Sequence, residues 1–363
     1  MMLSGLALQH LRTHAQFFLK FEQPVVLIIG PNASGKTTLI EAIHLLSSGE
    51  SFRAGKIDEL IQFGAELARV KGKIDQDEVE VIITPGEVQG KRTSKRLYSV
   101  NGVRRQKKAA TSFFSTVVFR PEDMRLIEGS PARRRSFLDT PLSHLSSEYA
   151  RSLHTYEQTL LRRNKLLQQV REREQPATTL QFWNLSLVKH GELVQHWRQV
   201  MLQHLTSVSF PVNFSVTYVP SIISEARLKE YGPREIAAGH TLIGPHKDDF
   251  VVHLTKPARV AGRDAVQLQT LNAADYGSRG EQRLAVLWLK FGELSYIEQQ
   301  TGKKPILLLD DILSELDSDS QRLALSVLPH YQSVVTTIDP ELEQVVRAAA
   351  PDLQVLTLAG LPD

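Results

Sequence analysis

The sequence Gly30-Pro31-Asn32-Ala33-Ser34-Gly35-Lys36-Thr37-Thr38 decides the fold, because it matches the phosphate-binding pattern G-x-x-x-x-G-K-[ST]. The run before it, residues 25–29, is β-branched and apolar throughout, as a buried parallel strand is. Residues 38–46 after it have the apolar spacing of a helix. A loop of this kind directs its backbone N–H groups and the helix N-terminus at a phosphate. We therefore predict that residues 30–38 bind a nucleotide.

Two side chains of this phosphate-binding loop have predicted chemical roles. Lys36 would place its charge on the β- and γ-phosphate oxygens and act in catalysis, and Thr37 would offer its hydroxyl to Mg²⁺. The alternative is a glycine-rich loop that caps a helix and binds no ligand. The regular strand and helix on either side argue against that alternative.

The length and composition of the chain limit the classes of protein to consider. A chain of 363 residues indicates two lobes, or one large α/β domain with an insertion. No apolar run approaches the roughly 20 residues of a membrane span, and the first residues lack the pattern of a secretory signal. We therefore expect a cytoplasmic protein without a membrane partner. Because cysteine is absent, disulfides, thiolate zinc sites and a cysteine nucleophile are excluded.

The middle of the chain is predicted to be helical. Two long apolar stripes at three- and four-residue steps cover residues 149–170 and 180–208, and Gln175-Pro176-Ala177 separates them. This pattern predicts an antiparallel helical hairpin, about 40 Å long at about 1.5 Å per residue. Arg163 interrupts the first stripe.

Strand patterns flank this helical segment on both sides. Apolar runs at residues 306–309 and 333–337 predict two further buried strands. The helical segment is therefore expected to be inserted into one nucleotide-binding fold. The predicted division is a first lobe at residues 1–120 and 300–363, and a second lobe at residues 121–299 that carries the helical arm.

The segment between Lys91 and Lys108 is strongly basic. It contains eight Lys or Arg residues and no acidic one, and Asn101-Gly102 is a turn signal. We expect one basic hairpin there, which suits contact with a nucleic-acid phosphate backbone. The alternative is a solvated edge hairpin whose lysines prevent aggregation. The candidate DNA-binding residues are Lys91, Arg92, Arg104, Arg105, Lys107 and Lys108.

The strand predicted at residues 306–309 ends in two carboxylates, Asp310 and Asp311. In a nucleotide site the first acid supports Mg²⁺, and the second can polarise the attacking water. Two acids at this edge would repel each other without a cation, so a plain strand end is the weaker interpretation. We expect Asp310 to join Thr37 at the metal, and Asp311 to join Lys36 in catalysis.

Further motifs occur in the order found in ABC-type ATPases. Ser278-Arg279-Gly280-Glu281 stands at a predicted helix start, residues 306–311 follow, and Ser314-Glu315-Leu316-Asp317 comes next. These segments are similar to the signature, Walker B and D-loop motifs. With four other stretches, the chain more narrowly resembles the RecF family, which is related to the SMC heads; these stretches are residues 49–53, 119–131, 133–139 and 241–249. The resemblance implies an α/β fold, a P-loop ABC-type ATPase head with an inserted helical second lobe.

The resemblance also implies how the site works. Ser278, Arg279 and Gly280 would complete, in trans, the γ-phosphate site of a second copy, so that ATP joins two chains into a homodimer. Asp311 stands where many relatives have a catalytic Glu. Because aspartate is the shorter acid, the resemblance implies a weak ATPase.

The implied role is ATP-dependent DNA binding in replication, recombination and repair, including the SOS response to DNA damage. The DNA would be single-stranded or gapped double-stranded, and the protein would aid loading of the RecA recombinase. RecR and RecO are the implied partners, and ATP and Mg²⁺ the implied cofactors.

Three other classes stay open: the ATPase subunit of an ABC transporter, an SMC-like chromosome-structure ATPase, and a P-loop kinase for small molecules, in which residues 278–280 would have no role. A transporter subunit usually carries a switch histidine, whereas residues 336–339 are Thr, Thr, Ile and Asp. The arms of SMC proteins run for hundreds of residues, far longer than the predicted hairpin. The residue that senses the γ-phosphate in place of a switch histidine is left open.

Overall fold

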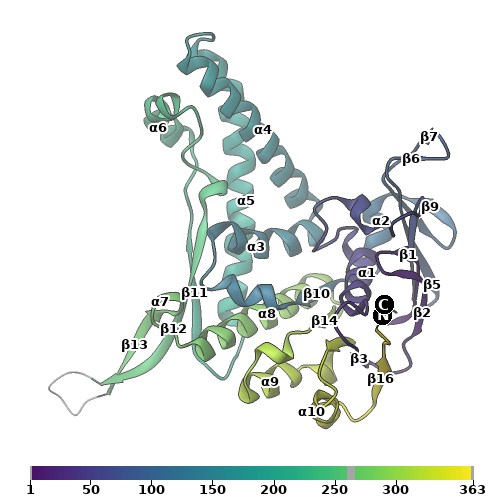
Figure 1. Cartoon of the computed structure of the whole chain (residues 1–363). Helices are drawn as coiled ribbons and strands as arrows, with labels where there is room; N and C mark the ends of the chain where they lie inside the picture. The colour runs from purple at the N-terminus through teal and green to yellow at the C-terminus, as the bar shows by residue number, and fades with distance from the viewer. Residues whose placement is uncertain (1, 260–265, 361–363) are drawn as a thin grey trace. The chain divides into compact units, whose positions relative to one another are not determined.

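The middle of the chain forms a structural unit of its own. The computed structural model describes residues 2–259 and 266–360 (Figure 1). One unit consists of Met1–Asp123 together with Ile297–Asp363, and the other of Met124–Tyr296. The predicted α/β class is confirmed by the sheets and helices of the first unit.

A parallel sheet carries the phosphate-binding loop in the first unit. Its strand order is β10 (Thr116–Phe119), β14 (Ile306–Asp310), β15 (Ser333–Thr337), β3 (Val25–Ile29) and β16 (Leu353–Thr357). Every residue of β3, β14 and β15 is buried, as in parallel strands that are covered on both faces. Because all neighbouring strands are parallel, their carboxyl ends meet at one edge. That edge brings the loop after β3 to the acids after β14.

An antiparallel sheet covers the helix that follows the loop. Its order is β2 (His14–Lys20), β1 (Leu3–Leu11), β4 (Ala68–Ile74), β5 (Asp77–Ile83), β8 (Arg96–Val100) and β9 (Val103–Arg105). Helix α1 (Lys36–Ser48) contacts strands of both sheets and shares one hydrophobic core with them. The other strands and α-helices that lie wholly within the described part of this unit are β6 (Glu87–Val88), β7 (Lys91–Arg92), α2 (Lys107–Thr111), α9 (Ser318–Leu325) and α10 (Leu342–Ala349).

The second unit is built on the predicted helical hairpin, which the structure confirms. After α3 (Pro131–Leu145), helices α4 (Ser147–Arg171) and α5 (Gln181–Ser207) lie side by side (Figure 1). Helix α6 (Glu225–Ala238) packs on both of them. An antiparallel sheet of β11 (Phe214–Val219), β12 (Asp249–Arg259) and β13 (Val266–Asn272) follows, then α7 (Ala273–Tyr276) and the start of α8 (Arg279–Thr301). No helix within the described residues is long and apolar enough to cross a membrane.

Arg163, which interrupts the apolar stripe of α4, lies in the core. Its side chain is 1% exposed and forms a 2.6 Å ion pair with Glu235 of α6, whose side chain is 0% exposed. The guanidinium also donates to Thr241 Oγ1 and to Asn184 Oδ1, each at 2.7 Å. Because a buried charge must be paired and hydrogen-bonded, this cluster fixes α6 against the hairpin.

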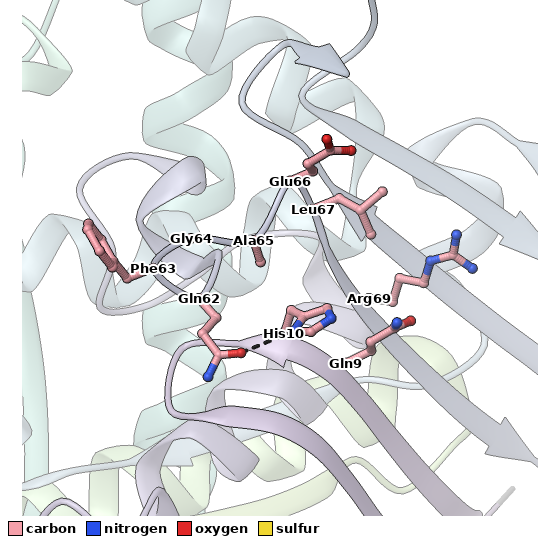
Figure 2. A pocket seen from close by; sticks show the side chains of 9 residues that line it. All are labelled: Gln9, His10, Gln62, Phe63, Gly64, Ala65, Glu66, Leu67 and Arg69. Atoms are coloured by element: carbon pink, nitrogen blue, oxygen red, sulfur yellow. Dashed lines mark hydrogen bonds between the residues drawn. The ribbon is translucent and has the colours of Figure 1, made fainter. Parts of the chain in front are cut away.

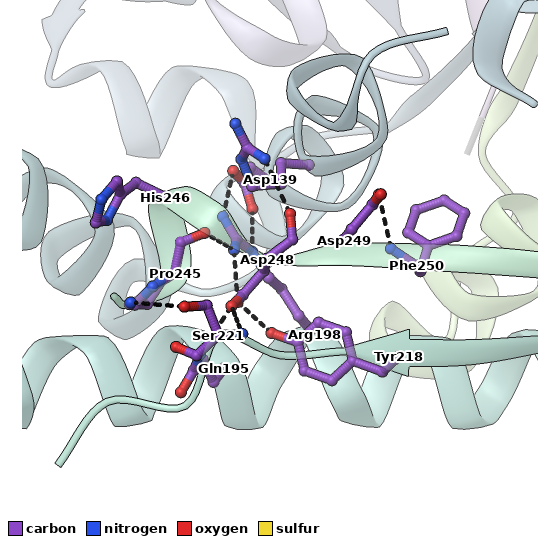
Figure 3. A network of polar contacts seen from close by, with 12 residues as sticks. Asp139, Gln195, Arg198, Tyr218, Ser221, Pro245, His246, Asp248, Asp249 and Phe250 are labelled. Atoms are coloured by element: carbon purple, nitrogen blue, oxygen red, sulfur yellow. Dashed lines mark hydrogen bonds and ion pairs between the residues drawn. The ribbon is translucent and has the colours of Figure 1, made fainter. Parts of the chain in front are cut away.

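A second buried arginine joins three segments of this unit (Figure 3). Arg198 of α5 makes two 2.8 Å hydrogen bonds to Asp139, and it donates to Asp248 at 3.0 Å and to the Pro245 carbonyl at 2.8 Å. Asp248 also accepts from the Gln195 amide, the Ser221 N–H and the Tyr218 hydroxyl. Residues 133–139 and 241–249, two stretches on which the family resemblance rests, thus meet here and stabilise the second unit.

His246 belongs to the same region and is held neutral. The Tyr156 hydroxyl donates to His246 Nδ1 at 2.7 Å, and His246 Nε2 donates to the Thr241 carbonyl at 3.2 Å. Burial lowers the pKa of His246 to about 4. A protonated ring would lose the bond from Tyr156, because Nδ1 would then be a donor.

We expect Arg163→Met to destabilise the second unit by about 3–5 kcal/mol, because it leaves the buried Glu235 carboxylate unpaired. Thermal and urea unfolding, followed by circular dichroism and limited proteolysis, measure the effect. Lys165→Met is the matched control, since Lys165 is exposed on the same helix and should change stability by less than about 0.5 kcal/mol. Equal stability of the two variants would contradict the assignment of Arg163 to the core.

We also expect His246 to make stability depend on pH. The unfolded state binds a proton at His246 near the ordinary pKa of 6.5, whereas the folded state binds it only near pH 4. Stability from this group is therefore complete above pH 6.5 and is lost as the pH falls toward 4, by at most about 3 kcal/mol. Melting temperatures between pH 7.5 and 5 should fall less steeply in His246→Gln than in the unaltered protein. Parallel curves would refute this prediction.

Candidate nucleotide-binding site

The phosphate-binding loop turns sharply between β3 and α1, as the sequence predicts. Gly35 has φ of +93°, a left-handed conformation that favours glycine. A Cβ atom at Gly35 would also lie 2.3 Å from His14 Nε2, so no side chain fits there. Helix α1 begins at Lys36, and its first N–H groups lack helical partners. The loop and the helix N-terminus together therefore form a place for an anion.

Lys36 holds the loop together in this structure. Its side chain is 4% exposed, and Nζ donates to the carbonyls of Gly30 at 2.8 Å and Pro31 at 3.0 Å. The carboxylate of Asp311 lies 3.8 Å from the same nitrogen. The structure thus brings together the two residues predicted to be catalytic.

Asp310 lies at the centre of the site. Its Oδ1 accepts hydrogen bonds from the hydroxyls of Thr37 and Thr336, each at 3.0 Å. Burial raises the pKa of Asp310, and the bonds from Thr336 and Thr37 partly offset that rise. Burial also raises the pKa of Asp311, and the charge of Lys36 partly offsets it. Both acids are therefore positioned by neighbours that favour their charged form.

The residues present fit Mg²⁺. The oxygens of Thr37 and Asp310 lie 3.0 Å apart, and Mg²⁺ is usually held by one or two such protein ligands, with phosphate oxygens and waters completing its shell. Two buried oxygens at the site, Ser34 Oγ and Asp311 Oδ1, have no hydrogen-bond partner among the described residues. Buried oxygens without partners are costly, and a bound nucleotide with its water would supply partners for them.

Thr336 is a site residue that the sequence analysis did not identify. Besides donating to Asp310, its Oγ1 accepts the N–H of Asp311 at 3.0 Å. Asp311 has φ of +50°, which is unusual outside glycine, and this hydrogen bond helps to hold it. The signal was the position of Thr336 near the end of a buried parallel strand, at the edge where the acids lie.

The turn between β1 and β2 supports the loop from the side, and it too was missed. Arg12 makes two hydrogen bonds, of 2.6 and 3.0 Å, to Glu41 on α1, which is fully buried and also accepts from the Ser51 hydroxyl. His14 Nε2 donates to the Gly35 carbonyl at 3.2 Å, and burial lowers the pKa of this histidine. His14, which directly follows the turn, therefore places a neutral imidazole in contact with the phosphate-binding loop.

The predicted trans element belongs to the second unit. Ser278 stands immediately before α8, which begins at Arg279 and continues through Gly280. Ser278 and Arg279 are exposed, and Gly280 is half-buried. Their contact with the loop of a second copy remains a prediction.

The basic hairpin predicted around Asn101-Gly102 is confirmed as β8 and β9, but the prediction that it extends over the whole of residues 91–108 is wrong. Lys91 and Arg92 form β7, which pairs with β6, whereas Arg104 and Arg105 lie on β9, which pairs with β8 around the Asn101-Gly102 turn. Lys107 and Lys108 belong to α2. The pattern was misleading because a second hairpin, with Glu87 on its other strand, occupies the first part of the segment.

The six candidate DNA-binding residues differ in their surroundings. Lys107 forms an ion pair with Glu50, which also pairs with Arg96. The other five are exposed, and no ion pair joins them to any residue that the structure describes; they are Lys91, Arg92, Arg104, Arg105 and Lys108. Five of the six charges are thus available to a polyanion.

A surface hollow of about 530 Å³ lies on the antiparallel sheet of the first unit (Figure 2). Its lining residues are Gln9, His10, Gln62, Phe63, Gly64, Ala65, Glu66, Leu67 and Arg69. None of them belongs to the phosphate-binding loop or to the acids after β14. We therefore place the nucleotide at the edge of the parallel sheet and not in this hollow.

Comparison with known proteins agrees with this arrangement. The family model described as the RecF/RecN/SMC N terminal domain matches residues 2–350. "DNA replication and repair protein RecF" of Bacillus cereus (strain G9842) is 32% identical over 362 residues, which cover 93% of this chain and 92% of that protein. The protein of the same name from Agathobacter rectalis is 29% identical over 350 residues, with the same coverage.

Comparison with solved structures also finds proteins named RecF. The structure of the recombination mediator protein RecF-ATPrS in the RecFOR pathway has a TM-score of 0.79 and 29% identity, covering 93% of this chain and 92% of that chain. The corresponding RecF-ATP structure has a TM-score of 0.76 and 28% identity. The fold predicted from the sequence, a RecF- and SMC-type ATPase head, is thereby confirmed. With the phosphate-binding loop facing the two acids, and with relatives of the same name along nearly its whole length, this chain belongs to the RecF family of DNA replication and repair proteins.

Proposed function

We propose that this protein is a weak ATPase, that its binding to DNA depends on ATP, and that it acts in DNA replication and recombinational repair. The observation that carries the proposal is the edge of the parallel sheet, where Lys36, Thr37, Asp310 and Asp311 converge. Relatives named for replication and repair, and RecF structures named for ATP, support the same function.

Each residue of the site has a proposed part in ATP binding and hydrolysis. Residues 30–38 bind the phosphates through backbone N–H groups, and Lys36 moves its ammonium from the Gly30 and Pro31 carbonyls to phosphate oxygens. Thr37 and Asp310 would hold Mg²⁺, which would neutralise negative charge on the phosphates. Asp311 accepts a hydrogen bond from the attacking water. Because aspartate reaches less far than glutamate, the proposed turnover is slow.

The site is proposed to be complete only in a homodimer. Ser278, Arg279 and Gly280 of one copy would contact the γ-phosphate held by residues 30–38 of the other copy. The charged side chain of Arg279 and the hydrogen-bond donors at the helix start suit that position. ATP would then close the dimer and hydrolysis would open it.

The two proposed lobes have different roles in this scheme. Residues 1–120 and 300–363 form the ATPase lobe, and residues 121–299 carry the arm and the signature element.

We propose that the closed dimer binds single-stranded and gapped double-stranded DNA and aids loading of the RecA recombinase, including in the SOS response. RecR and RecO are the proposed partners, supported by the RecFOR pathway named for the similar structures. A cytoplasmic location follows from chromosomal DNA as the proposed substrate. The exposed basic residues of β7, β9 and α2 are the proposed contact with the phosphate backbone.

The transporter and SMC-like classes are not favoured. The relatives from Agathobacter rectalis, Lachnospira eligens and Clostridium perfringens, which cover 93% of this chain, are named for DNA replication and repair and not for transport. Helices α4 and α5 have 25 and 27 residues, far from the hundreds in an SMC arm.

We expect Lys36→Ala to lower ATP turnover at least a hundredfold and to weaken nucleotide binding, because the phosphates lose their buried cation. Asp311→Asn should lower turnover while the protein still binds ATP and dimerises, since the amide cannot accept a proton from water. Phosphate release, together with sedimentation velocity with and without ATP, measures both effects. A dimer that forms equally well without ATP, or full turnover by Lys36→Ala, would sink the proposed function.

For DNA, we expect the triple variant Arg104→Ala, Arg105→Ala and Lys108→Ala to weaken binding and to flatten its salt dependence. Fluorescence anisotropy with gapped duplex DNA at 50–300 mM salt gives both quantities. The control removes the same charge at exposed lysines elsewhere in the first unit, as Lys20→Ala, Lys73→Ala and Lys303→Ala. If the control loses affinity and the first variant does not, the DNA contact lies elsewhere.

A further inference from the structure

Ser278 and Glu281 hold each other at the start of α8. The Ser278 N–H donates to Glu281 Oε2 at 2.7 Å, and the Glu281 N–H donates to Ser278 Oγ at 3.3 Å. This is a reciprocal capping arrangement, in which a serine before the helix and an acid three residues later satisfy each other's backbone.

The arrangement determines which donors Ser278 has left. Its N–H donates to Glu281, its Oγ accepts the Glu281 N–H, and its hydroxyl also forms a hydrogen bond with the Glu281 carboxylate. The N–H groups of Arg279 and Gly280, in the first turn of α8, have no helical acceptor. The element therefore presents two backbone donors to a phosphate, together with a hydroxyl for which the Glu281 carboxylate competes.

The same arrangement places a carboxylate where a phosphate is to bind. Burial raises the pKa of Glu281, but hydrogen bonds from the Ser278 N–H and from Lys256 more than offset this and lower it, so Glu281 is ionised at neutral pH. A carboxylate hydrogen-bonded to Ser278 would repel the γ-phosphate that Ser278 is proposed to contact.

Lys256 of β12 provides the opposite charge. Its Nζ lies 3.1 and 3.2 Å from the two oxygens of Glu281 and 3.4 Å from the Tyr276 carbonyl. Within residues 2–259 and 266–360, Lys256 is the cation that the structure pairs with Glu281. The side chains of Lys256 and Glu281 are 35% and 28% exposed, so the pair contributes little to folding. We therefore expect the ion pair of Lys256 and Glu281 to affect nucleotide binding more than stability.

We propose that Lys256 is a positioning residue for the second half of the ATP site, which neutralises Glu281 and holds it against Ser278 so that the start of α8 accepts a γ-phosphate. The inference rests on the proposed function, since it requires Ser278 to meet the ATP of another copy. A direct contact between Lys256 and the phosphate is the competing explanation. The two differ in what happens when Glu281 loses its charge.

The experiment uses the full-length protein and four variants, Lys256→Met, Lys256→Arg, Glu281→Gln and the double variant Lys256→Met with Glu281→Gln. Dimer formation with ATP and Mg²⁺ is measured by sedimentation velocity, and ATP binding to monomers by a fluorescent ATP analogue at low protein concentration. Lys229→Met, an exposed lysine on α6, is the control.

We expect Lys256→Met to weaken ATP-dependent dimerisation about tenfold and to leave monomer nucleotide binding unchanged, whereas Lys256→Arg and Lys229→Met dimerise normally. Glu281→Gln keeps a side chain that can cap the helix but removes the charge, so the double variant should return to within about threefold of Glu281→Gln. Normal dimerisation by Lys256→Met would overturn the inference, as would a double variant as weak as Lys256→Met. If the unaltered protein binds ATP but does not dimerise, the proposed function fails instead, and this inference fails with it.

Discussion

One hydrogen bond, from the Thr37 hydroxyl to Asp310, joins residues 273 positions apart and depends on the parallel sheet of the first unit. It forms since β3 and β14 lie in one parallel sheet, with β15 between them, and end at the same edge. Thr336, near the end of β15, completes the link, because its hydroxyl donates to the Asp310 carboxylate and accepts the backbone N–H of Asp311. The sheet therefore does more than support the site: its strand order brings an N-terminal loop and a C-terminal acid to the same edge.

The features that could be predicted from the sequence are those that produce a pattern in consecutive residues. The loop pattern, the apolar run of β3 and the stripes of α4 and α5 each occupy consecutive residues, and the structure confirms those elements. The fold class followed from their order and from the family resemblance. The proximity of Lys36 to Asp311 was also predictable, because strands in a parallel sheet place their carboxyl ends together.

The features that were missed depend on partners distant in sequence. Arg163 looked like a flaw in an apolar stripe because its partner, Glu235, is on another helix. Lys107 looked available to DNA, but Glu50 pairs with it from a different segment. Strand β16 went unrecognised, since its five residues carry only a short pattern and gain their order from pairing with β3. In each case the deciding contact is tertiary, and no local pattern records it.

The position of β3 has a consequence for biosynthesis. Both of its neighbours in the sheet, β15 and β16, come from residues 333–357, so the strand that carries the phosphate-binding loop has no pairing partner while most of the chain is being translated. Its five apolar residues would stay without strand partners on the ribosome until the last segment emerges. An exposed apolar strand of this kind is prone to aggregation. The nascent protein is therefore most vulnerable just before its nucleotide site can form, and truncation near the C-terminus would leave that site unmade.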